Sequence, residues 1–566
     1  MTFIKPNTVC YAVLILSLLI LCSCARIGEY AKERADKAAY EIIEKKQMEA
    51  LGELADFNID DEMDPVTAWI YTEAPDIGYA REGYTSPSFL LSLGETMAVA
   101  VSNNRDYKSQ RESLYSQALS LTEVRRNFHY LFDASANASL SRTEFENGDE
   151  TVEWFGSRGL SAGVSKLFAT GARMTLDFSH SFTRYLSNDP RPGASNSLAF
   201  AITQPLLRGA GAFTVREGLR QSERSMIYSV RSFRRYQQEF IITVASQYFN
   251  LLDYNNQLRN AQLNYQSTLD NLNKLERLSE GGRVTSLDVD QARQAVLEAE
   301  IRLVRIQLDY ARRLDELKIF LGIPMTLDIG PDPQQLVSIA ERGLLRPDMT
   351  LKQAMDIALE ERLDYKTQMD QIDDAVRQVK ISLRNFLPNL DVGYNFSTTD
   401  SAEKDRIRFD FENNDQRWYI SLGIPFDWTP RRNAFRNSLI SLEQSRRNLE
   451  LFRENLILEV RDAWRALEES RTDYRIQLES VRIAERRVRR ASLFLESGRA
   501  TARDLLEAEE ALLQSRNALS SALVRHTIER MRFWNTIERF EIDEHGLWTD
   551  LDEISPVNNI TYQGTN

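Results

Sequence analysis

One heptad ladder of apolar residues occurs twice along this chain, and it limits the possible folds more than any other feature. The first copy places apolar side chains seven residues apart at Val244, Leu251, Leu258, Tyr265 and Leu272. The same spacing returns 216 residues later at Val460, Leu467, Tyr474, Val481 and Val488. A sustained seven-residue period is typical of helices that pack as coiled coils. Its duplication in register indicates an internal repeat of helical hairpins.

Each ladder ends at a short turn of the same sequence type. The turns are Gly282-Arg283-Val284-Thr285 and Gly498-Arg499-Ala500-Thr501. We expect a long helix before each turn, at about 213–280 and about 431–497, and a returning helix of roughly 40 residues after it. At a rise of 1.5 Å per residue, each long helix reaches about 100 Å. A compact soluble domain has no use for such a span.

The segment before each long helix changes from a helical period to a period of two. Both copies first carry a matching helix of about 35 to 40 residues, shown by Asp106-Tyr107-Lys108 and, 258 residues later, Asp364-Tyr365-Lys366. Apolar residues then alternate with small polar residues, as in half-buried strands. The apolar positions are Phe132, Ala134, Ala136, Ala138 and Leu140 in the first copy, and Leu390, Val392, Tyr394 and Phe396 in the second.

The first copy contains extra residues between its two strands. The prolines that close the second strand of each copy, Pro205 and Pro425, are 220 residues apart, whereas the opening helices are 258 apart, which leaves 38 residues in addition. These residues also alternate, at 160–164 and at 174–178. The pattern predicts an inserted hairpin at about 155–190, either in the sheet or beside it.

The N-terminus has the organisation of a secretory signal. Lys5 supplies a positive charge, and residues 9–21 form an apolar stretch shorter than the roughly 20 residues that a spanning helix needs. The sequence Leu21-Cys22-Ser23-Cys24 then resembles a bacterial lipobox, which implies cleavage before Cys24 and acylation of that residue. The alternative is an ordinary signal peptide with a chance cysteine. By the same resemblance, Ala25 in place of an aspartate favours sorting to the outer membrane.

Composition excludes several classes of protein. The net charge is −13, which argues against a nucleic-acid binder, because such proteins need an excess of Lys and Arg. The three cysteines are Cys10, Cys22 and Cys24. We therefore expect no disulfide and no cysteine-based metal site in the body of the chain.

The residue patterns of enzymes are also missing from the sequence. The four histidines are scattered at His129, His180, His526 and His545, with no partner at metal-ligand spacing. Gly209-Ala210-Gly211 lacks the third glycine and the Lys-Ser/Thr of a phosphate loop, so a strand-to-helix turn explains it better. The basic run at 482–490 is either a solvated helix face or a contact to an acidic partner. We expect no catalytic residue, no cofactor and no metal.

The order of elements, given twice, resembles the outer-membrane efflux protein family typified by TolC. The matching motifs are Gly282-Arg283-Val284-Thr285 with Asp288 and Ala292, Gly498-Arg499-Ala500-Thr501 with Asp504 and Ala508, and Gln204-Pro205-Leu206-Leu207-Arg208-Gly209. In that family three protomers share one twelve-stranded barrel in the outer membrane, continued by an α-helical barrel through the periplasm. The fold class implied is an α+β membrane protein, a duplicated helix-strand-strand-helix-helix unit that forms these two barrels as a trimer. The inserted hairpin departs from the minimal pattern and leaves the strand count open.

The resemblance covers roughly residues 88–545 and suggests a division of the chain. The expected segments are a lipoprotein signal peptide at 1–23, a polar helix and tether at 24–87, a first efflux repeat at 88–330, a linker at 331–348, a second repeat at 349–545 and a polar tail at 546–566. A physical argument leads to the same fold class. Backbone polar groups in lipid must be paired by hydrogen bonds, so a chain without a long apolar helix can span the membrane only as a closed barrel. Four or six strands from one chain are too few for a wide pore. A soluble sandwich with helical appendages is the alternative.

The function implied by the resemblance is an exit duct of a tripartite efflux or type I secretion system, with no enzymatic activity. Its partners would be two further copies of the chain, a periplasmic membrane-fusion (adaptor) protein, outer-membrane lipid and, indirectly, an inner-membrane RND or ABC transporter. A non-channel periplasmic coiled-coil lipoprotein or adaptor scaffold is the rival from another class. An adaptor would have one helical hairpin rather than a duplicated unit with two strand pairs.

Two groups of residues carry the site predictions. By resemblance, the turn residues Gly282, Arg283, Val284, Thr285, Gly498, Arg499, Ala500 and Thr501 contact the adaptor at the periplasmic tip. The alternative is that glycine merely ends each helix. Asp504 and Glu507 lie one helical turn apart just inside the tip, where the resemblance implies a constricting acidic ring. With Asp288 they are the candidate periplasmic gate, whose negative field would attract cations. Where three protomers bring these carboxylates together on one axis, we expect mutual repulsion to raise some of their pKa values. Ordinary surface charge is the alternative.

Overall fold

The structure is a computed structural model that describes residues 6–542 except for 56, 61–63, 79–86, 148, 186–192, 343, 345–346, 403–406, 408 and 498. His545 and the polar tail at 546–566 lie outside the described residues. The chain divides into two compact units. The sheet unit comprises Met1–Glu49, Tyr115–Ser229 and Thr367–Leu449, and the tip unit comprises Ala50–Leu114, Val230–Lys366 and Glu450–Asn566.

The N-terminal helix α1 runs over Pro6–Leu51, longer than the polar helix that the sequence predicts from residue 25 onward. Ala39, Ile42 and Ile43 are buried, as their shared face predicts, and the hydroxyl of Tyr115 donates a hydrogen bond to Asp36. The side chain of Cys24 lies outside the described part of the structure. No described helix combines the length and the apolar character needed to cross a membrane.

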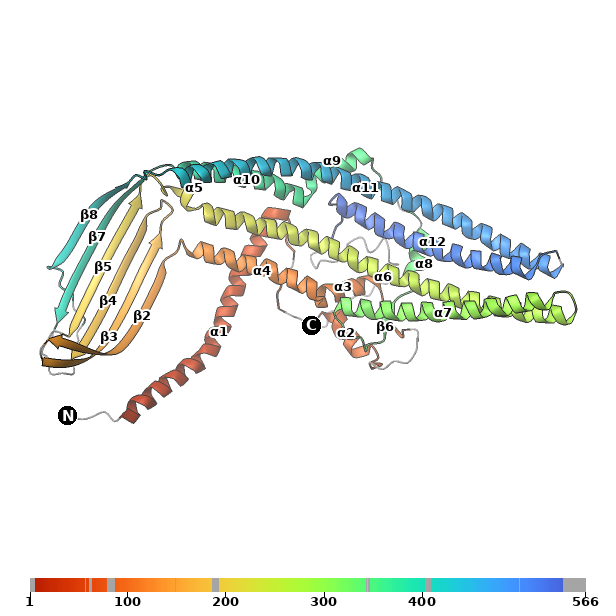
Figure 1. The fold of residues 1–566 in the computed structure, drawn as a ribbon, viewed down its shortest axis with the longest axis horizontal. Coiled ribbons are helices and arrows are strands. Elements are labelled where there is room, and N and C mark those ends of the chain that lie inside the picture. The colour runs from red at the N-terminus through yellow and green to blue at the C-terminus, as the bar shows by residue number, and fades with distance from the viewer. Residues whose placement is uncertain are drawn as a thin grey trace, which may run out of the picture. The chain divides into compact units, whose positions relative to one another are not determined.

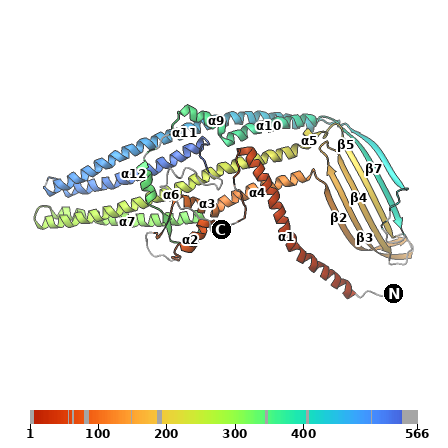
Figure 2. The ribbon, with the colours of Figure 1, turned by 180° about the vertical axis from the view of Figure 1, so that it is seen from behind.

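Six described strands form one antiparallel sheet in the sheet unit, in the order β2-β3-β4-β5-β7-β8 (Figure 1). Their bounds are β2 Leu131–Asn147, β3 Asp149–Leu167, β4 Arg173–Tyr185, β5 Ala194–Pro205, β7 Asn389–Ala402 and β8 Asn414–Gly423. The inserted hairpin of the sequence is therefore β3 and β4, and it lies inside the sheet rather than beside it. Figure 2 shows the sheet from behind, and the strands that adjoin helices in the sequence, β2, β5, β7 and β8, do so at one end of it.

The two faces of this sheet differ in chemistry. Across five neighbouring strands, paired residues on one face are Phe132, Val164, Leu176, Phe200 and Phe396. On the opposite face a second set of paired residues is Ser135, Ser161, Ser179, Ser197 and Thr399. On the edge strand, Trp418, Ile420 and Leu422 continue the apolar face, and Trp418 is 75% exposed. Strand alternation thus produces one apolar and one small polar surface.

Two helical hairpins dominate the tip unit. The first joins α6 (Glu217–Glu280) to α7 (Ser286–Leu321), and the second joins α11 (Thr429–Glu496) to α12 (Ala502–Thr536) (Figure 1). The heptad residues Val244, Leu251 and Leu258 are buried on α6, and Val460 and Leu467 are buried on α11, as coiled-coil packing requires. A short helix α5 (Ala212–Val215) precedes α6.

Each opening helix, expected as one element, is broken in two. The pieces are α3 (Leu93–Asn103) with α4 (Arg105–Arg126), and α9 (Leu351–Glu361) with α10 (Leu363–Arg384). The break falls at Asn104 in the first copy and Arg362 in the second, where the backbone is extended with ψ of 129° and 122°. The side chain of Asn104 accepts a hydrogen bond from the amide of Tyr107 at 2.8 Å, and Arg362 forms an ion pair with Asp364 at 3.0 Å. Such junction contacts do not alter the helical period, which explains why the sequence shows one helix.

The segment expected as an irregular tether contains helix α2 (Pro65–Glu73). Asp64 caps it, because its side chain accepts hydrogen bonds from the amides of Val66 and Thr67 at 2.9 and 3.2 Å, with Pro65 at the favoured first position. Ile70 is fully buried in the core of the tip unit. The remaining described elements of this unit are β1 (Phe89–Leu91), which pairs in parallel with β6 (Ile329–Pro331), and α8 (Gln334–Arg342).

Candidate functional site

The first tip turn is closed by backbone hydrogen bonds around a left-handed glycine. Gly282 has φ of +69°, a conformation that disfavours side chains. Its amide donates to the carbonyl of Ser279 at 2.9 Å, and the amide of Arg283 donates to the carbonyl of Leu278 at 2.9 Å. This pair of bonds is the Schellman arrangement, which satisfies the last carbonyls of α6.

The second tip turn repeats part of this pattern. The amide of Arg499 donates to the carbonyl of Phe494 at 2.8 Å, the equivalent of the bond from Arg283. Gly498 itself lies outside the described residues. Because the described bonds of both turns come from main-chain amides, closing the turns does not require the side chains of Arg283 and Arg499. Both side chains are exposed, whereas Val284 and Ala500 are half-buried.

A capping box starts the helix that follows each turn. The hydroxyl and the amide of Thr285 donate to the carboxylate of Asp288 at 2.7 and 3.0 Å. Thr501 donates to Asp504 in the same way, at 2.8 Å for both bonds. Losing an N-cap of this kind costs about 0.5 to 2 kcal/mol. Thr285 and Thr501, predicted to contact the adaptor, and Asp288 and Asp504, predicted for the gate, thus have a structural role in starting α7 and α12.

The two tips share one hydrophobic cluster. Leu272, Leu275, Val289, Ala292 and Val296 of the first hairpin are buried together with Leu495, Ala502 and Leu505 of the second. Val284 packs against this cluster from the first turn. The exposed polar residues of the two tip turns therefore lie next to one shared hydrophobic cluster.

The candidate gate carboxylates each have a partner within the single chain, and their mutual repulsion around a threefold axis stays a prediction. In the single chain, hydrogen bonds from the amide and then the hydroxyl of Thr501 lower the pKa of Asp504. Glu507 forms an ion pair with Arg503 at 2.8 Å, and Arg487 lies 4.0 Å away. Asp504 is therefore ionised at any physiological pH, and Glu507 is partly neutralised by its neighbours.

A polar groove of about 740 Å³ lies beside these carboxylates, between α7 and α12. It is lined by Asn264, Thr268, Gln291, Gln294, Ala295, Glu298, Arg302, Arg503, Leu506, Glu507, Glu509, Glu510, Ala511 and Gln514. Arg302 spans it to reach Glu510 at 3.0 Å. The groove is thus charged on both walls and lies next to the candidate gate.

Glu509 is the most unusual residue of this groove, because it is a buried carboxylate with only 8% exposure. Its Oε1 accepts hydrogen bonds from Ser267 at 2.8 Å and Asn271 at 2.6 Å, both on α6. Its Oε2 has no hydrogen-bond partner among the described residues. Burial raises the pKa of Glu509 more than the two hydrogen bonds lower it. Ionisation at this position therefore works against the packing of α12 on α6.

We expect Glu509→Gln to stabilise the fold at pH 8 by about 1 kcal/mol, because the amide keeps the accepting oxygen and removes a buried charge. A raised carboxyl pKa contributes stability below the ordinary carboxyl pKa and loses it as pH rises through the folded value. The difference between variant and wild type should therefore shrink at pH 5. Unfolding temperatures measured at both pH values test this, with the exposed Glu300→Gln as control. An equal difference at pH 5 and pH 8 would contradict the assignment.

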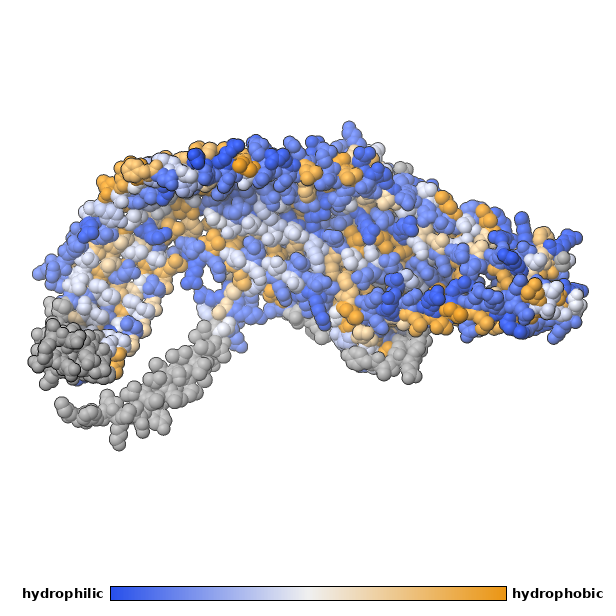
Figure 3. Space-filling model, in the orientation of Figure 1, coloured by the Kyte–Doolittle hydropathy of each residue, from blue (hydrophilic) through white to orange (hydrophobic). Residues whose placement is uncertain are grey.

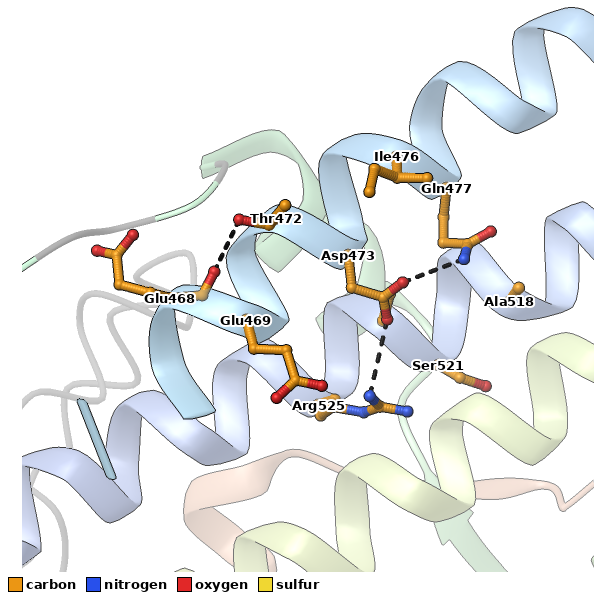
Figure 4. A pocket seen from close by; sticks show the side chains of 10 residues that line it. Glu468, Glu469, Thr472, Asp473, Ile476, Gln477, Ala518, Ser521 and Arg525 are labelled. Atoms are coloured by element: carbon orange, nitrogen blue, oxygen red, sulfur yellow. Dashed lines mark hydrogen bonds and ion pairs between the residues drawn. The ribbon is translucent and has the colours of Figure 1, made fainter. Parts of the chain in front are cut away.

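A second polar hollow of about 810 Å³ lies on α11 and α12. Figure 4 shows Gln477 and Arg525 both reaching Asp473, at 3.1 and 3.7 Å. The ion pair of Arg525 ties α12 to α11, whereas the bond from Gln477 lies within α11. Among the described residues, no group of three or more His, Cys, Asp or Glu side chains is arranged to hold a metal ion.

A model of the family described as outer membrane efflux protein matches residues 132–322 and 354–530, which together exceed half of the chain. The chain belongs to the outer membrane efflux protein family. This confirms the resemblance seen in the duplicated motifs, and each matched segment lies within one predicted repeat. The comparison with curated proteins gave no match.

Solved structures of three outer membrane proteins share the fold. The Campylobacter jejuni CmeC outer membrane channel aligns with a TM-score of 0.58 at 15% identity, over 84% of this chain and 99% of its own. The outer membrane protein VceC from Vibrio cholerae aligns with a TM-score of 0.57 at 14% identity, over 79% of this chain and 95% of its own. The Neisseria gonorrhoeae MtrE outer membrane channel aligns with a TM-score of 0.55 at 15% identity, over 86% of this chain and 95% of its own.

Sequence reasoning missed two features of this efflux protein. The capping boxes were visible as Thr285 and Thr501, each followed three residues later by aspartate, which is a helix-start signal. The buried position of Glu509 was visible in its spacing, because it falls with Ala502, Leu505 and Leu513 on one face of the helix. The charges of Asp288 and Asp504 pointed to a gate although both residues cap helices, and no role was predicted for Glu509.

Proposed function

We propose that three copies of this chain form an exit duct through the outer membrane, as part of a tripartite efflux or type I secretion system. The duct has a β-barrel in the membrane and an α-helical barrel in the periplasm, and it performs no catalysis itself. The two-faced sheet carries this proposal. A barrel wall between lipid and a water-filled lumen needs one apolar face and one polar face, and the sheet has both.

One chain does not close such a wall. The strands β2 and β8 are the two edges of the described sheet, so each has backbone groups without a strand partner. Such groups must be paired in lipid, where no water replaces the missing hydrogen bonds. Pairing with further copies of the chain satisfies them and encloses a lumen.

The helices support assembly of several chains as well. Exposed apolar residues on α7 follow heptad spacing at Leu297, Ile301, Val304 and Leu308. On α11, Leu451 with Leu458 and Ile476 with Ile483 are exposed and seven apart. Figure 3 shows apolar surface along the region where Figure 1 places α7. Stripes of this spacing pack against other helices, so we assign them to contacts between copies.

We expect Ile301→Glu to dissociate the trimer. Ile301 is 60% exposed in the single chain, and a carboxylate there would be buried without a partner on assembly, at a cost of several kcal/mol. Light scattering in mild detergent should give the mass of three chains for the wild type and for the control Glu300→Ala, and a lower mass for Ile301→Glu. A wild-type protein that is a stable monomer would contradict the proposal.

Lipid anchoring through Cys24 is part of the same proposal and rests on the lipobox resemblance. Acyl chains bind a membrane through their buried methylene groups, each contributing about 0.8 kcal/mol. We expect Cys24→Ala to lose acylation and to be sorted incorrectly. Labelled palmitate should enter the wild type and Cys22→Ala at similar levels, and Cys24→Ala not at all. Equal labelling of the wild type and Cys24→Ala would remove the lipid anchor from the account.

The tip is proposed to receive the helical-hairpin end of a periplasmic adaptor, which in turn connects to an RND or ABC transporter. Arg283 and Arg499 support this, because both are exposed at the ends of the long hairpins.

Asp504 and Glu507, with Asp288, are proposed as the acidic ring of the periplasmic gate. The ionised state of Asp504 supports the ring, since a charged group is what the field requires.

A further inference from the structure

The inserted hairpin changes the construction of the sheet. Strand β3 pairs with β2 from Leu131↔Ser165 to Asn147↔Asp149, and β4 pairs with β5 from Arg173↔Thr203 to Phe182↔Ala194. Without the hairpin, β2 and β5 would be neighbours. Two full strands instead separate them, and β3 pairs with β4 from Phe155↔Tyr185 to Leu167↔Arg173. The hairpin therefore widens the sheet rather than covering it.

Both faces of the sheet continue across the hairpin. Val164 and Leu176 extend the apolar face between Phe132 and Phe200. On the polar face, the hydroxyl of Ser161 hydrogen-bonds Ser135 at 2.7 Å. Ser179 hydrogen-bonds Ser197 on the other side of the hairpin, also at 2.7 Å. A plug or an outer flap would not need an apolar and a polar face in register with the rest of the wall.

The two edges of the sheet have opposite directions. β2 begins at Leu131, shortly after α4, and runs away from the helices, whereas β8 ends at Gly423, shortly before α11, and runs toward them. Copies related by rotation about a common axis therefore bring β8 of one chain antiparallel to β2 of the next. Closure in this way keeps every neighbouring pair antiparallel, as a membrane barrel requires.

We propose that the six described strands of each copy all enter the barrel wall, so that three copies close a barrel of eighteen strands. This inference rests on the proposed function and departs from the twelve strands that the family resemblance implies. With strands about 4.8 Å apart and tilted by about 40°, eighteen strands give a backbone diameter of about 36 Å, against about 24 Å for twelve. The cross-section is about 2.3-fold larger, which is the size range of porins with an aqueous channel.

The wider barrel moves size selection to the other end of the duct. With a membrane segment of this width, the acidic gate proposed at the tip is the narrower part of the duct. Substrates are consequently selected at the tip, by its opening and its charge, and not in the membrane.

Single cysteines test the inference strand by strand. In trimers in lipid bilayers, Ser161→Cys and Ser179→Cys should react with a water-soluble maleimide, and Val164→Cys and Leu176→Cys should react at least about tenfold more slowly, because lipid covers them. Ser197→Cys and Phe200→Cys on β5 provide the matched pair for the wall itself. Rapid labelling at all four hairpin positions, together with fast labelling of Ser197→Cys and slow labelling of Phe200→Cys on β5, would overturn the eighteen-stranded barrel and leave the channel intact. Loss of alternation on β5 as well would overturn the channel.

A strand count by electron cryomicroscopy of the wild-type trimer in nanodiscs gives an independent result. Eighteen strands in the ring support the inference. Twelve strands, with the hairpin outside the ring, would overturn it and leave the exit duct intact. The absence of a strand ring would overturn both.

Discussion

Reversing the charge of both exposed tip arginines, with Arg283→Glu and Arg499→Glu in one chain, should abolish export while the trimer stays intact. The turns are closed by main-chain amides, so the substitutions do not remove the bonds that shape the tip. They place carboxylates at the proposed adaptor-docking surface, in three copies. Like charges that meet at an interface cost several kcal/mol, or about 100-fold or more in affinity.

Export is measured in cells that carry the cognate adaptor and pump, and docking by co-purification of the adaptor with the duct. The exposed Lys352→Glu on α9 reverses one charge away from the tip and should leave both unchanged. Full export and full co-purification by the double variant would show that the tip arginines do not contact the adaptor.

Neutralising the candidate gate should raise single-channel current and reduce cation preference about tenfold, because an acidic constriction concentrates cations. Asp504→Asn with Glu507→Gln is the suitable variant, since the asparagine oxygen keeps an acceptor for Thr501 and so preserves the start of α12. Block by polyvalent cations should weaken at the same time. Alanine at position 504 would mix the loss of charge with the loss of a cap.

Planar-bilayer recordings of wild type and double variant measure current, selectivity and block together. Because hydrogen bonds from Thr501 lower the pKa of Asp504, the wild-type selectivity should persist well below neutral pH. Unchanged conductance, selectivity and block in the double variant would place these carboxylates outside the constriction. The equivalent first-copy residues, Asp288 and Gln291, would then be the next candidates for the gate.

Periodicity made most of the fold predictable. The heptads located both long helices, and the alternation between Phe132 and Leu140 located β2, because side-chain spacing follows directly from helix and strand geometry. The extra alternation at 160–164 and 174–178 also identified a hairpin. Its place inside the sheet was not predictable, since pairing partners depend on contacts between distant segments.

The features that the sequence did not predict depend on side-chain contacts and helix caps, which leave the apolar period unchanged. Asn104 and Arg362 break the opening helices through contacts with residues around them, and these leave no trace in the apolar period. Helix α2 was hidden by an acidic composition, although Asp64 before Pro65 is a helix-start signal. At the candidate site, charge alone did not separate Asp504, which caps a helix, from Glu509, which is buried against α6.

The central claim is that the assembled chains conduct ions through the outer membrane, and the most direct test is the current through purified wild-type trimers in a planar lipid bilayer. The account predicts discrete current steps of uniform size with a preference for cations. A trimer that inserts into the bilayer and carries no current, before and after neutralisation of Asp504 and Glu507, would contradict it.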